Sequence, residues 1–525
     1  MYLIIALDAI IITNILISFT IIITADVIPT AVINTRTILL YSVISPPPLL
    51  DCSAPKCPDW RTPDMTGLRR RGNSKEYTQT ESSDGSDCKR LNNLKESGSE
   101  RQASNLTHFK ARKSILDLED MDAGGPPMRG FFALFWITIF LYAANSVYHN
   151  QANHFMGISL RLWQASYSDF EALLVMIAAI YLYAHIAVPY QIAITRGWVT
   201  AEWSLVALTF RLLLQNGPIM MAIFVAQYRS WPRLQTGSLL LFSIVMSFKM
   251  HSYLSTNKKL HKLWLQGKSP APTPFTSLEY PHNLTLAHYT CFLWFPTLIY
   301  QLGYPRSERI RVGYLLERTA GVIVIFTLFY LVASHYVHPV LLTFDGRPTL
   351  DILVDLVLPC LTCALLFFFL VFEYLLNWAA EVSYFADRHF YSDWWNSTDL
   401  AEFARKWNVP IHKFLQHHIY LELQEGGYSE FSARSLTFLF SSIFHEIVMS
   451  CTAKRLKFWI LAMQMLQLPL TYLTKAVGLR QRPFLANCIW WLMIILGIPI
   501  LILLYSRDVN LALFTREIKH FLNKF

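Results

Sequence analysis

Residues 351–378 read DILVDLVLPCLTCALLFFFLVFEYLLNW, an almost unbroken apolar run. At about 1.5 Å per residue, such a run crosses the ~30 Å hydrocarbon core of a bilayer as one α-helix. It therefore predicts a transmembrane helix. Similar runs recur at about 131–149, 171–190, 201–227, 236–254, 312–337, 431–451, 457–475 and 485–506. Together they predict an all-α polytopic membrane protein of about nine transmembrane helices.

The composition supports the same class of protein. Of the 525 residues, 53% are hydrophobic and only 15% are charged, and the mean hydropathy is +0.32. Soluble domains carry about 25% charged residues, so this deficit indicates an integral membrane protein. Cytosolic loops rich in Lys and Arg are the first explanation of the net charge of +9, and an anionic ligand is the second. The 8 Cys show no CxxC or zinc spacing, so neither disulfides nor a metal site is expected.

Three regions of the chain differ in character. Residues 1–45 begin with an apolar segment that fits a secretory signal poorly, because no basic stretch precedes it. Its status is undecided between an extra span and a doubtful translation start. Residues 46–128 lack apolar periodicity and are rich in charged and small polar residues, which predicts a disordered cytosolic tail. Residues 129–525 hold the other apolar runs and form the predicted membrane domain.

Two polar loops interrupt the apolar runs, at about 255–311 and 379–430. Both are rich in Lys and Arg, whereas the loop at 338–350 has a single basic residue. Cytosolic loops carry the excess of basic residues, so both long loops are predicted to be cytosolic and the C-terminus luminal. The very short turn at 452–456 has two basic residues and runs against this rule.

His445 is the most informative residue, in the sequence SSIFHEIVMS at 441–450. An ionisable group deep in a span is costly and normally faces a cavity or a partner. The structural alternative is a histidine that bonds two helices together. The neighbouring Glu446 disfavours that alternative, because two ionisable groups cost more than one. Imidazole titrates near neutral pH, so His445 is a candidate general base that takes a proton from an alcohol as its oxygen attacks a thioester.

A second cluster lies in the polar loop that leads into the His445 span. It reads FYSDWWN at Phe390–Asn396 and WNVPIHK at 407–413, and His417 and His418 follow. Aromatic side chains with a carboxylate, amides and a cation are suited to line the mouth of a ligand tunnel. An amphipathic helix with a Trp/Tyr belt at the membrane interface explains the same composition equally well.

These segments resemble known motifs. FYSDWWN resembles the FYxDWWN motif, WNVPIHK the WNxPVHK segment, and Phe444-His445-Glu446 the FHE segment of one family. That family is the membrane-bound O-acyltransferases, in its branch of sterol and diacylglycerol O-acyltransferases. The similarity is collinear from about 285 to 506, nearly half the chain. The runs at 384–391 and 309–314 resemble the fungal-type sterol O-acyltransferases.

The resemblance implies a role for each matching residue. His445 would be the catalytic base, and Asn408 a second active-site residue that positions a substrate. Glu446 and Gln467 would be polar neighbours in a reaction chamber enclosed by the helices. The acyl-CoA entrance would be shaped by Phe390, Tyr391, Asp393, Trp394, Trp395 and Asn396.

The resemblance also implies the reaction and its partners. Acyl-CoA is the co-substrate and enters from the cytosol, the sterol enters from the bilayer, and no metal, cofactor or acyl-enzyme is required. Related enzymes form dimers in the endoplasmic reticulum membrane, so a multi-pass protein of that membrane and a homodimer or higher homo-oligomer are expected. No nucleic-acid partner is expected.

The acceptor is predicted to be a sterol 3-hydroxyl, with diacylglycerol as the alternative. Diacylglycerol enzymes resemble one another in a Gly-Gln-Pro segment in the last span, and here that place reads Gly497-Ile498-Pro499. Diacylglycerol brings ester carbonyls that cost about 1–3 kcal/mol each when buried without a partner. A sterol brings one hydroxyl on a rigid apolar body, which an apolar Ile498 accommodates.

Three other classes of protein fit less well. A di-iron desaturase needs several histidine boxes, and only His412 with His417 and His418 loosely resembles one. A serine hydrolase needs a GxSxG elbow, which the chain lacks. A transporter would explain the spans but not the two polar loop motifs, and no inverted repeat is visible.

Overall fold

The computed structural model describes residues 109–113, 137, 166–199, 205–268, 275, 278–343 and 346–506. Within these ranges the chain is almost entirely helical, and its extended pairings are two isolated bridges, Arg112 with Asp387 and Arg306 with Phe385. The predicted all-α class is therefore confirmed.

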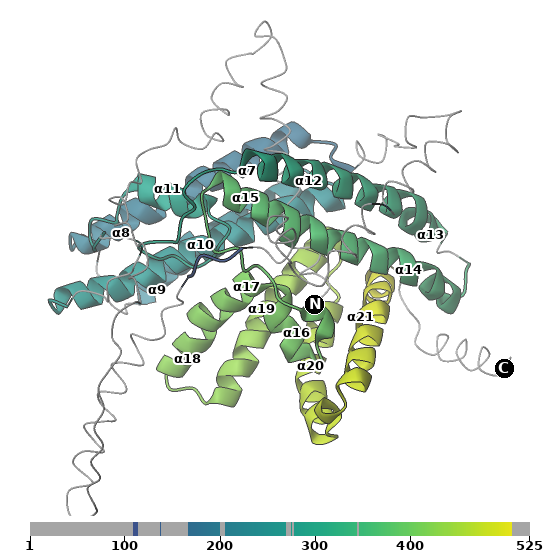
Figure 1. The fold of residues 1–525 in the computed structure, drawn as a ribbon. Coiled ribbons are helices and arrows are strands. Elements are labelled where there is room, and N and C mark those ends of the chain that lie inside the picture. The colour runs from purple at the N-terminus through teal and green to yellow at the C-terminus, as the bar shows by residue number, and fades with distance from the viewer. Residues whose placement is uncertain are drawn as a thin grey trace, which may run out of the picture.

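The elements follow one another as α7 (Phe170–Ala184), α8 (Ala187–Thr195), α9 (Leu205–Tyr228), α10 (Arg233–Leu265), α11 (Leu286–Trp294), α12 (Val312–Val332), η2 (Ala333–Val337), α13 (His338–Leu342), α14 (Thr349–Phe368), η3 (Phe369–Leu375), α15 (Leu376–Val382), η4 (Trp394–Asn396), α16 (Leu400–Trp407), α17 (Val409–Leu415), η5 (Gln416–Tyr420), α18 (Leu421–Glu425), α19 (Glu430–Ala453), α20 (Trp459–Ala476), η6 (Leu479–Gln481) and α21 (Pro483–Ser506). In Figure 1, α19, α20 and α21 extend below the layer that α7 to α15 form.

Six stretches of the described residues are long and apolar enough to cross a membrane: Phe170–Thr195, Thr209–Tyr228, Val312–Leu342, Thr349–Val382, Glu430–Ala453 and Pro483–Ser506. The protein is therefore a multi-pass membrane protein. Of the remaining predicted spans, 131–149 lies outside the described residues apart from Ile137. The predicted spans at 236–254 and 457–475 form helices, α10 and α20, that are not among these six.

The long helix α10 packs against four other helices, α7, α8, α9 and α19. At 33 residues it is longer than the predicted span, and its buried face carries polar side chains that helices around it cover. Buried Lys249 donates to the carbonyl oxygens of Phe292, Leu293 and Phe295 at 2.9, 2.9 and 2.7 Å. It thereby satisfies carbonyls at the C-terminal end of α11, where a cation is favourable. Such internal partners explain why α10 is less apolar than a lipid-facing helix.

A continuous helical rod, α14–η3–α15, runs from Thr349 to Val382 and packs against α12, while α14 also packs against α21. Gly321 on α12 makes the first contact close: a Cβ there would lie 2.0 Å from a ring carbon of Tyr374. One turn away, Arg318 donates to the Glu373 carboxylate at 2.6 Å, and both side chains are fully buried. The rod and α12 are thus joined by the close packing of Tyr374 on Gly321 and by the buried Arg318–Glu373 ion pair.

Residues 109–113 cross the start of the 383–429 loop. The backbone N–H of Arg112 donates to Ala386 at 3.0 Å, and the backbone N–H of Arg388 donates back to Arg112 at 3.1 Å. The Arg112 guanidinium also contacts the Asp387 carboxylate at 3.0 Å. These five residues belong to the predicted tail at 46–128. The rest of that tail, and residues 1–45, lie outside the described residues.

Candidate active site

His445 lies within α19, and Ser429 starts this helix by accepting the N–H of Ser432 on its hydroxyl. The imidazole is 4% exposed. Its Nδ1 lies 2.6 Å from the carbonyl oxygen of Ser441, one turn earlier. A carbonyl only accepts hydrogen bonds, so Nδ1 carries the proton and Nε2 carries the lone pair. Nε2 is buried and has no hydrogen-bond partner among the described residues, as a general base requires.

An aromatic cluster holds the 407–413 motif against the helix of His445. Phe248 of α10 stacks on Phe414 of α17, with ring centroids 4.4 Å apart. The same ring contacts Phe444 of α19 at 5.2 Å, and Phe444 contacts Phe440 at 4.8 Å. Phe444 directly precedes His445. The cluster therefore places α17 next to the segment that carries the candidate base.

Asn408 separates α16 from α17 and is 4% exposed. Its Oδ1 accepts the backbone N–H of Ile411 at 3.2 Å, which makes it the N-cap of α17. The next residue, Val409, donates its backbone N–H to the carbonyl of Phe390 at 3.0 Å. The backbone N–H of Ser392 donates to the backbone carbonyl of Lys406 at 2.8 Å. The two loop motifs, 390–396 and 407–413, are thus joined by backbone hydrogen bonds.

The FYSDWWN motif divides into a buried and an exposed part. Phe390, Tyr391 and Trp394 are buried, Trp395 is half-buried, and Asp393 and Asn396 are exposed. The motif therefore does not present its side chains as one surface: its aromatic residues build the loop's core, and its polar residues face outward.

Each part of this motif has its own partners. The Tyr391 hydroxyl donates to Oε2 of Glu373 at 2.8 Å. Asp393 pairs with Lys406 at 3.1 Å. Trp394 meets Trp407 edge-on at 4.5 Å. A small apolar pocket lies between the loop and the rod, lined by Leu361, Ala364, Leu365, Trp394, Phe403, Trp407, Trp491 and Ile494.

Glu446 has a different set of partners from its neighbour His445. Its carboxylate accepts the backbone N–H groups of Phe458 and Leu461 at 3.1 and 3.3 Å, at the N-terminus of α20. It also accepts the Tyr505 hydroxyl at 2.9 and 2.8 Å. It thereby joins α19, α20 and α21. Gln467, the other predicted polar neighbour of the reaction chamber, is half-buried in α20.

Sequence reasoning missed the buried charges that support the loop. Arg318 and Glu373 anchor Tyr391, and buried Glu381 pairs with both Arg388 and Arg311. The signal was available, because ionisable residues inside apolar runs normally mark a partner or a function. What the sequence lacked was the pairing, since Arg318 and Glu373 lie on different helices.

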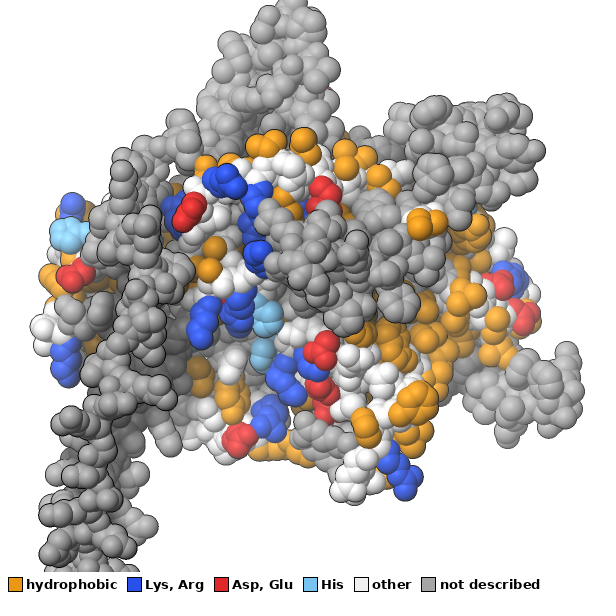
Figure 2. Space-filling model, in the orientation of Figure 1, with side chains coloured by type: hydrophobic (Ala, Val, Ile, Leu, Met, Phe, Trp, Pro, Cys, Tyr) orange, Lys and Arg blue, Asp and Glu red, His pale blue; other side chains and the backbone are white. Residues whose placement is uncertain are grey.

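Basic side chains gather on the outer face of the loop. Figure 2 shows Lys and Arg side chains over the region where α15, α16 and α17 lie in Figure 1. Arg405 is exposed, and Lys406 and Lys413 are partly exposed. Burial and the charges of Arg405 and Lys413 lower the pKa of His412 to about 4. Burial alone would raise the pKa of Glu402, but hydrogen bonds from Lys406 and Thr398 hold it at about 2.

Comparison with known proteins gives a consistent picture. The model of the membrane-bound O-acyltransferase family matches residues 196–507. The chain is 38% identical over 269 residues to "Diacylglycerol O-acyltransferase 1" of Dictyostelium discoideum, covering 50% of this chain and 43% of that protein. It is 28% identical over 420 residues to "Probable sterol O-acyltransferase 2" of Schizosaccharomyces pombe, covering 72% and 86%.

A third relative is "Sterol O-acyltransferase 2" of Saccharomyces cerevisiae, which is 35% identical over 241 residues, covering 43% of this chain and 38% of that protein. The chain thus spans less than half the length of the Dictyostelium and S. cerevisiae relatives. The family match includes both loop motifs and His445 and extends over more than half of the chain. On this match, and on its bundle of membrane-spanning helices, the chain belongs to the membrane-bound O-acyltransferase family.

Proposed function

We propose that this protein is an acyl-CoA-dependent O-acyltransferase that esterifies the 3-hydroxyl of a sterol. One observation carries the proposal: His445 lies inside a membrane-spanning helix, its Nδ1 faces a carbonyl oxygen, and its buried Nε2 has no hydrogen-bond partner within the part of the chain that the structure describes. A buried lone pair without a partner is costly in a purely structural histidine. It is the arrangement that a general base needs before its substrate arrives.

The reaction follows from this geometry. Nε2 of His445 takes the proton of the sterol hydroxyl as that oxygen attacks the thioester carbonyl carbon. The tetrahedral intermediate then collapses and the carbon–sulfur bond breaks. The CoA thiolate takes the proton back from the imidazolium, so CoA leaves as the thiol and His445 returns to its starting state. The Asn408 amide is assigned to hold a substrate oxygen, where hydrogen bonds gain strength from low polarity.

The loop is assigned to acyl-CoA. Its surface basic residues suit the phosphates of CoA by charge: Arg405 is exposed, and Lys406 and Lys413, which also pair with Asp393 and Asp387, are partly exposed. The apolar side chains around Trp394 and Trp491 match an acyl chain in polarity, and the small pocket that they line would have to widen to take one. The predicted entrance residues then fall into two groups: Asp393 and Asn396 face the outside, and Phe390, Tyr391, Trp394 and Trp395 shape the wall.

The choice of sterol rests on the relatives and on the last span. The S. pombe and S. cerevisiae relatives carry sterol O-acyltransferase names. Ile498 packs against an apolar cluster that includes Ile352 and Leu503. The sterol preference therefore rests on the sequence at this position, where an isoleucine offers no hydrogen bond to the ester carbonyls of diacylglycerol. The name of the Dictyostelium relative keeps diacylglycerol as the second candidate.

The setting of the enzyme is part of the proposal. Residues 129–525 would form the catalytic membrane domain behind a cytosolic tail. The protein would act in the endoplasmic reticulum membrane as a homodimer or higher homo-oligomer. The steryl ester, which has lost its only polar anchor, would collect for storage.

The test is a competition between acceptors. Purified protein is supplied with labelled oleoyl-CoA and a sterol, diacylglycerol, or an equal mixture of both, with His445→Ala as the blank. Steryl ester should be the main product of the mixture. Faster formation of triacylglycerol would overturn the sterol assignment and keep the acyltransferase assignment. No ester from either acceptor, with folded protein, would overturn both.

A further inference from the structure

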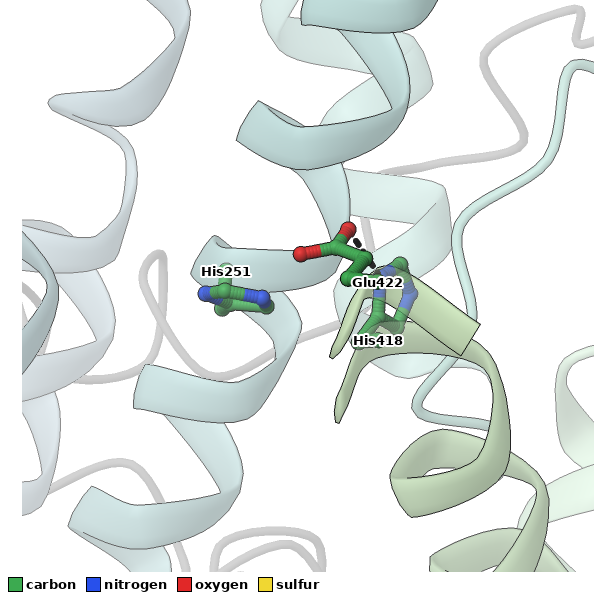
Figure 3. A group of neighbouring side chains, drawn as sticks. All are labelled: His251, His418 and Glu422. Atoms are coloured by element: carbon green, nitrogen blue, oxygen red, sulfur yellow. Dashed lines mark ion pairs between the residues drawn. The ribbon is translucent and has the colours of Figure 1, made fainter. Parts of the chain in front are cut away.

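Three side chains that the acyl-transfer proposal does not use converge near the end of the loop. His251 comes from α10, His418 from η5 and Glu422 from α18. One potential ligand atom from each lies within 4.8 Å of the others. Figure 3 shows the Glu422 carboxylate between the two imidazole rings, with its ion-pair contact to His418 dashed. This cluster of His251, His418 and Glu422 is called the His-Glu cluster below.

In each imidazole of the His-Glu cluster, one ring nitrogen contacts a neighbouring polar side chain and the other has no hydrogen-bond partner among the described residues. Nδ1 of His251 lies 3.4 Å from Oε1 of Gln215, and Nε2 of His418 lies 2.7 Å from the Ser252 hydroxyl. The other two nitrogens are buried and have no hydrogen-bond partner among the described residues. His418 itself is only 2% exposed. Its Nδ1 is 3.9 Å from Glu422, too far for a hydrogen bond.

This is the pattern of a metal-binding histidine. Ligating imidazoles use one nitrogen for the metal, and a hydrogen bond on the other nitrogen fixes the ring. His418 and Glu422 are spaced i, i+4, so both project from one side of a helical turn. η5 is a π-helical segment, an irregularity that often accompanies functional sites. We propose that the His-Glu cluster binds a divalent transition-metal ion of the zinc class.

The donor set selects that class of ion. Two imidazoles and a carboxylate suit Zn²⁺ and its neighbours, whereas Mg²⁺ and Ca²⁺ prefer oxygen ligands. The ligand atoms of a tetrahedral Zn²⁺ lie roughly 3.3 Å apart, so closing from 4.8 Å takes small side-chain rotations. A water molecule would fill the fourth position.

Neighbouring groups bear on the charge balance. Lys259 lies 3.7 Å from Glu422, and the Ser255 hydroxyl donates to the same carboxylate at 2.5 Å. Lys259 also lies 3.5 Å from Glu425 and is half-exposed. The Lys259 ammonium can therefore move to Glu425 when a metal ion binds to Glu422. Ser255 can keep its bond to the carboxylate oxygen that does not bind the metal.

The role of this metal is structural. It would join α10 to η5 and α18, directly after the α17 segment that Asn408 caps. The ring of Phe414 lies 6.0 Å from His251 and belongs to the aromatic cluster that continues to Phe444. Those rings separate the His-Glu cluster from the candidate base. The metal proposal thus stands independently of the acyl-transfer reaction.

The experiment uses full-length protein in detergent micelles, purified with a tag that contains no histidine. Bound metal is measured by mass spectrometry. The protein is then stripped with a chelator and titrated with Zn²⁺ against a fluorescent chelator, and thermal unfolding is recorded with and without Zn²⁺. His251→Gln, His418→Gln and Glu422→Gln are compared with His417→Gln, a half-buried neighbour outside the cluster.

Wild type and His417→Gln should bind about one Zn²⁺ per chain and unfold at a higher temperature with it. The three cluster variants should lose both effects. Gln215→Ala should bind Zn²⁺ about 10-fold more weakly, because the His251 ring loses the acceptor that orients it. If a cluster variant fails to fold, the Zn²⁺ affinities of wild type and Gln215→Ala still test the proposal. Stripped wild type that binds no Zn²⁺, or Zn²⁺ binding that survives in His418→Gln and Glu422→Gln, would overturn the proposal.

Discussion

At the scale of single residues, His445 and Glu446 are adjacent in sequence but have different surroundings. Among the described residues, Nε2 of His445 has no hydrogen-bond partner, whereas the Glu446 carboxylate accepts hydrogen bonds at the start of α20 and from Tyr505 of α21. Adjacent positions on a helix point about 100° apart, so only the Glu446 side chain faces the α20 terminus. The FHE segment thus places the candidate base next to a carboxylate that joins three helices.

The first prediction concerns His445. His445→Ala should lower the rate of ester formation by about 10²–10⁴-fold, the usual contribution of a general base, with little change in protein level. His335 is the matched control, because its Nδ1 contacts the carbonyl oxygen of Leu331 one turn earlier at 3.1 Å in another span. His335→Ala should remain active. Near-normal turnover of His445→Ala would remove it from the chemistry.

The second prediction separates two roles of Asn408. Asn408→Ala removes both the amide and the cap of α17, and losing the cap costs about 1 kcal/mol. Asn408→Ser keeps a capping oxygen but removes the amide N–H groups. If the amide positions a substrate, Asn408→Ser should fold with near-normal stability and lose most activity. Full activity in the serine variant would mean that Asn408 acts only as a cap.

At the scale of elements, the short helices α16 and α17 are capped by residues next to them in sequence, whereas α20 is capped from another helix. Asp399 starts α16 by accepting the N–H of Glu402 at 2.7 Å, and Asn408 starts α17. The N-terminus of α20 instead takes its acceptor from Glu446 on α19. A carboxylate there is also favoured by the helix dipole. The α19–α20 pair is therefore held by a side chain from the middle of a span.

The third prediction follows from that contact. Glu446→Gln should lower the free energy of unfolding by about 1–3 kcal/mol, because buried N–H donors lose a charged acceptor. Tyr505→Phe removes one donor to Glu446 and the acceptor of the Ile460 N–H, but it leaves the carboxylate on the N–H groups of Phe458 and Leu461, and it should cost less. Thermal unfolding is measured beside turnover per folded molecule. An unchanged unfolding temperature with lost turnover would support the chamber role that the family resemblance implies.

At the scale of the whole molecule, ion pairs join segments of the loop to one another and to residues 109–113, and one pair, Arg388 with Glu381, joins the loop to α15. Arg112 contacts Asp387, Glu381 holds Arg388, and Lys406 joins Glu402 to Asp393. These contacts lie at the end of the bundle where the predicted substrate entrance is. Stability should therefore respond to acid in a way that a purely apolar bundle would not.

The fourth prediction is the pH dependence. Burial lowers the pKa of His412 to about 4, against 6.5 for an ordinary histidine. Between those pH values the unfolded chain binds a proton that the folded protein does not, so stability falls as the pH drops from about 6.5 to 4. His412→Gln should reduce the slope of the unfolding temperature against pH in the range from about 6.5 to 4. No change in slope there would contradict the burial of a neutral His412.

Glu402 provides the control in a lower window. Its pKa is about 2 in the folded protein and 4.5 ordinarily, so its stabilisation is present above pH 4.5 and is lost as the pH falls toward 2. Glu402→Gln should change the curve only in that range. The two variants thus separate two titrations within one loop.

The sequence by itself determined the class, the family and the candidate base. Apolar runs long enough to cross a bilayer are local properties, and so are FYSDWWN, WNVPIHK and the histidine of the FHE segment. The length of α10 could not be predicted, because its polar residues are compensated by partners on other helices, such as the carbonyls around Lys249. Local hydropathy counts such residues as exposed.

Only the tertiary structure decided which groups have partners. The Arg318–Glu373 pair and the His-Glu cluster join helices far apart in sequence, and no local pattern states those pairings. The same holds for Nε2 of His445 and for the carboxylate of Glu446. A side chain's protonation and hydrogen bonds depend on what lies around it, and packing brings those surroundings from elsewhere in the chain.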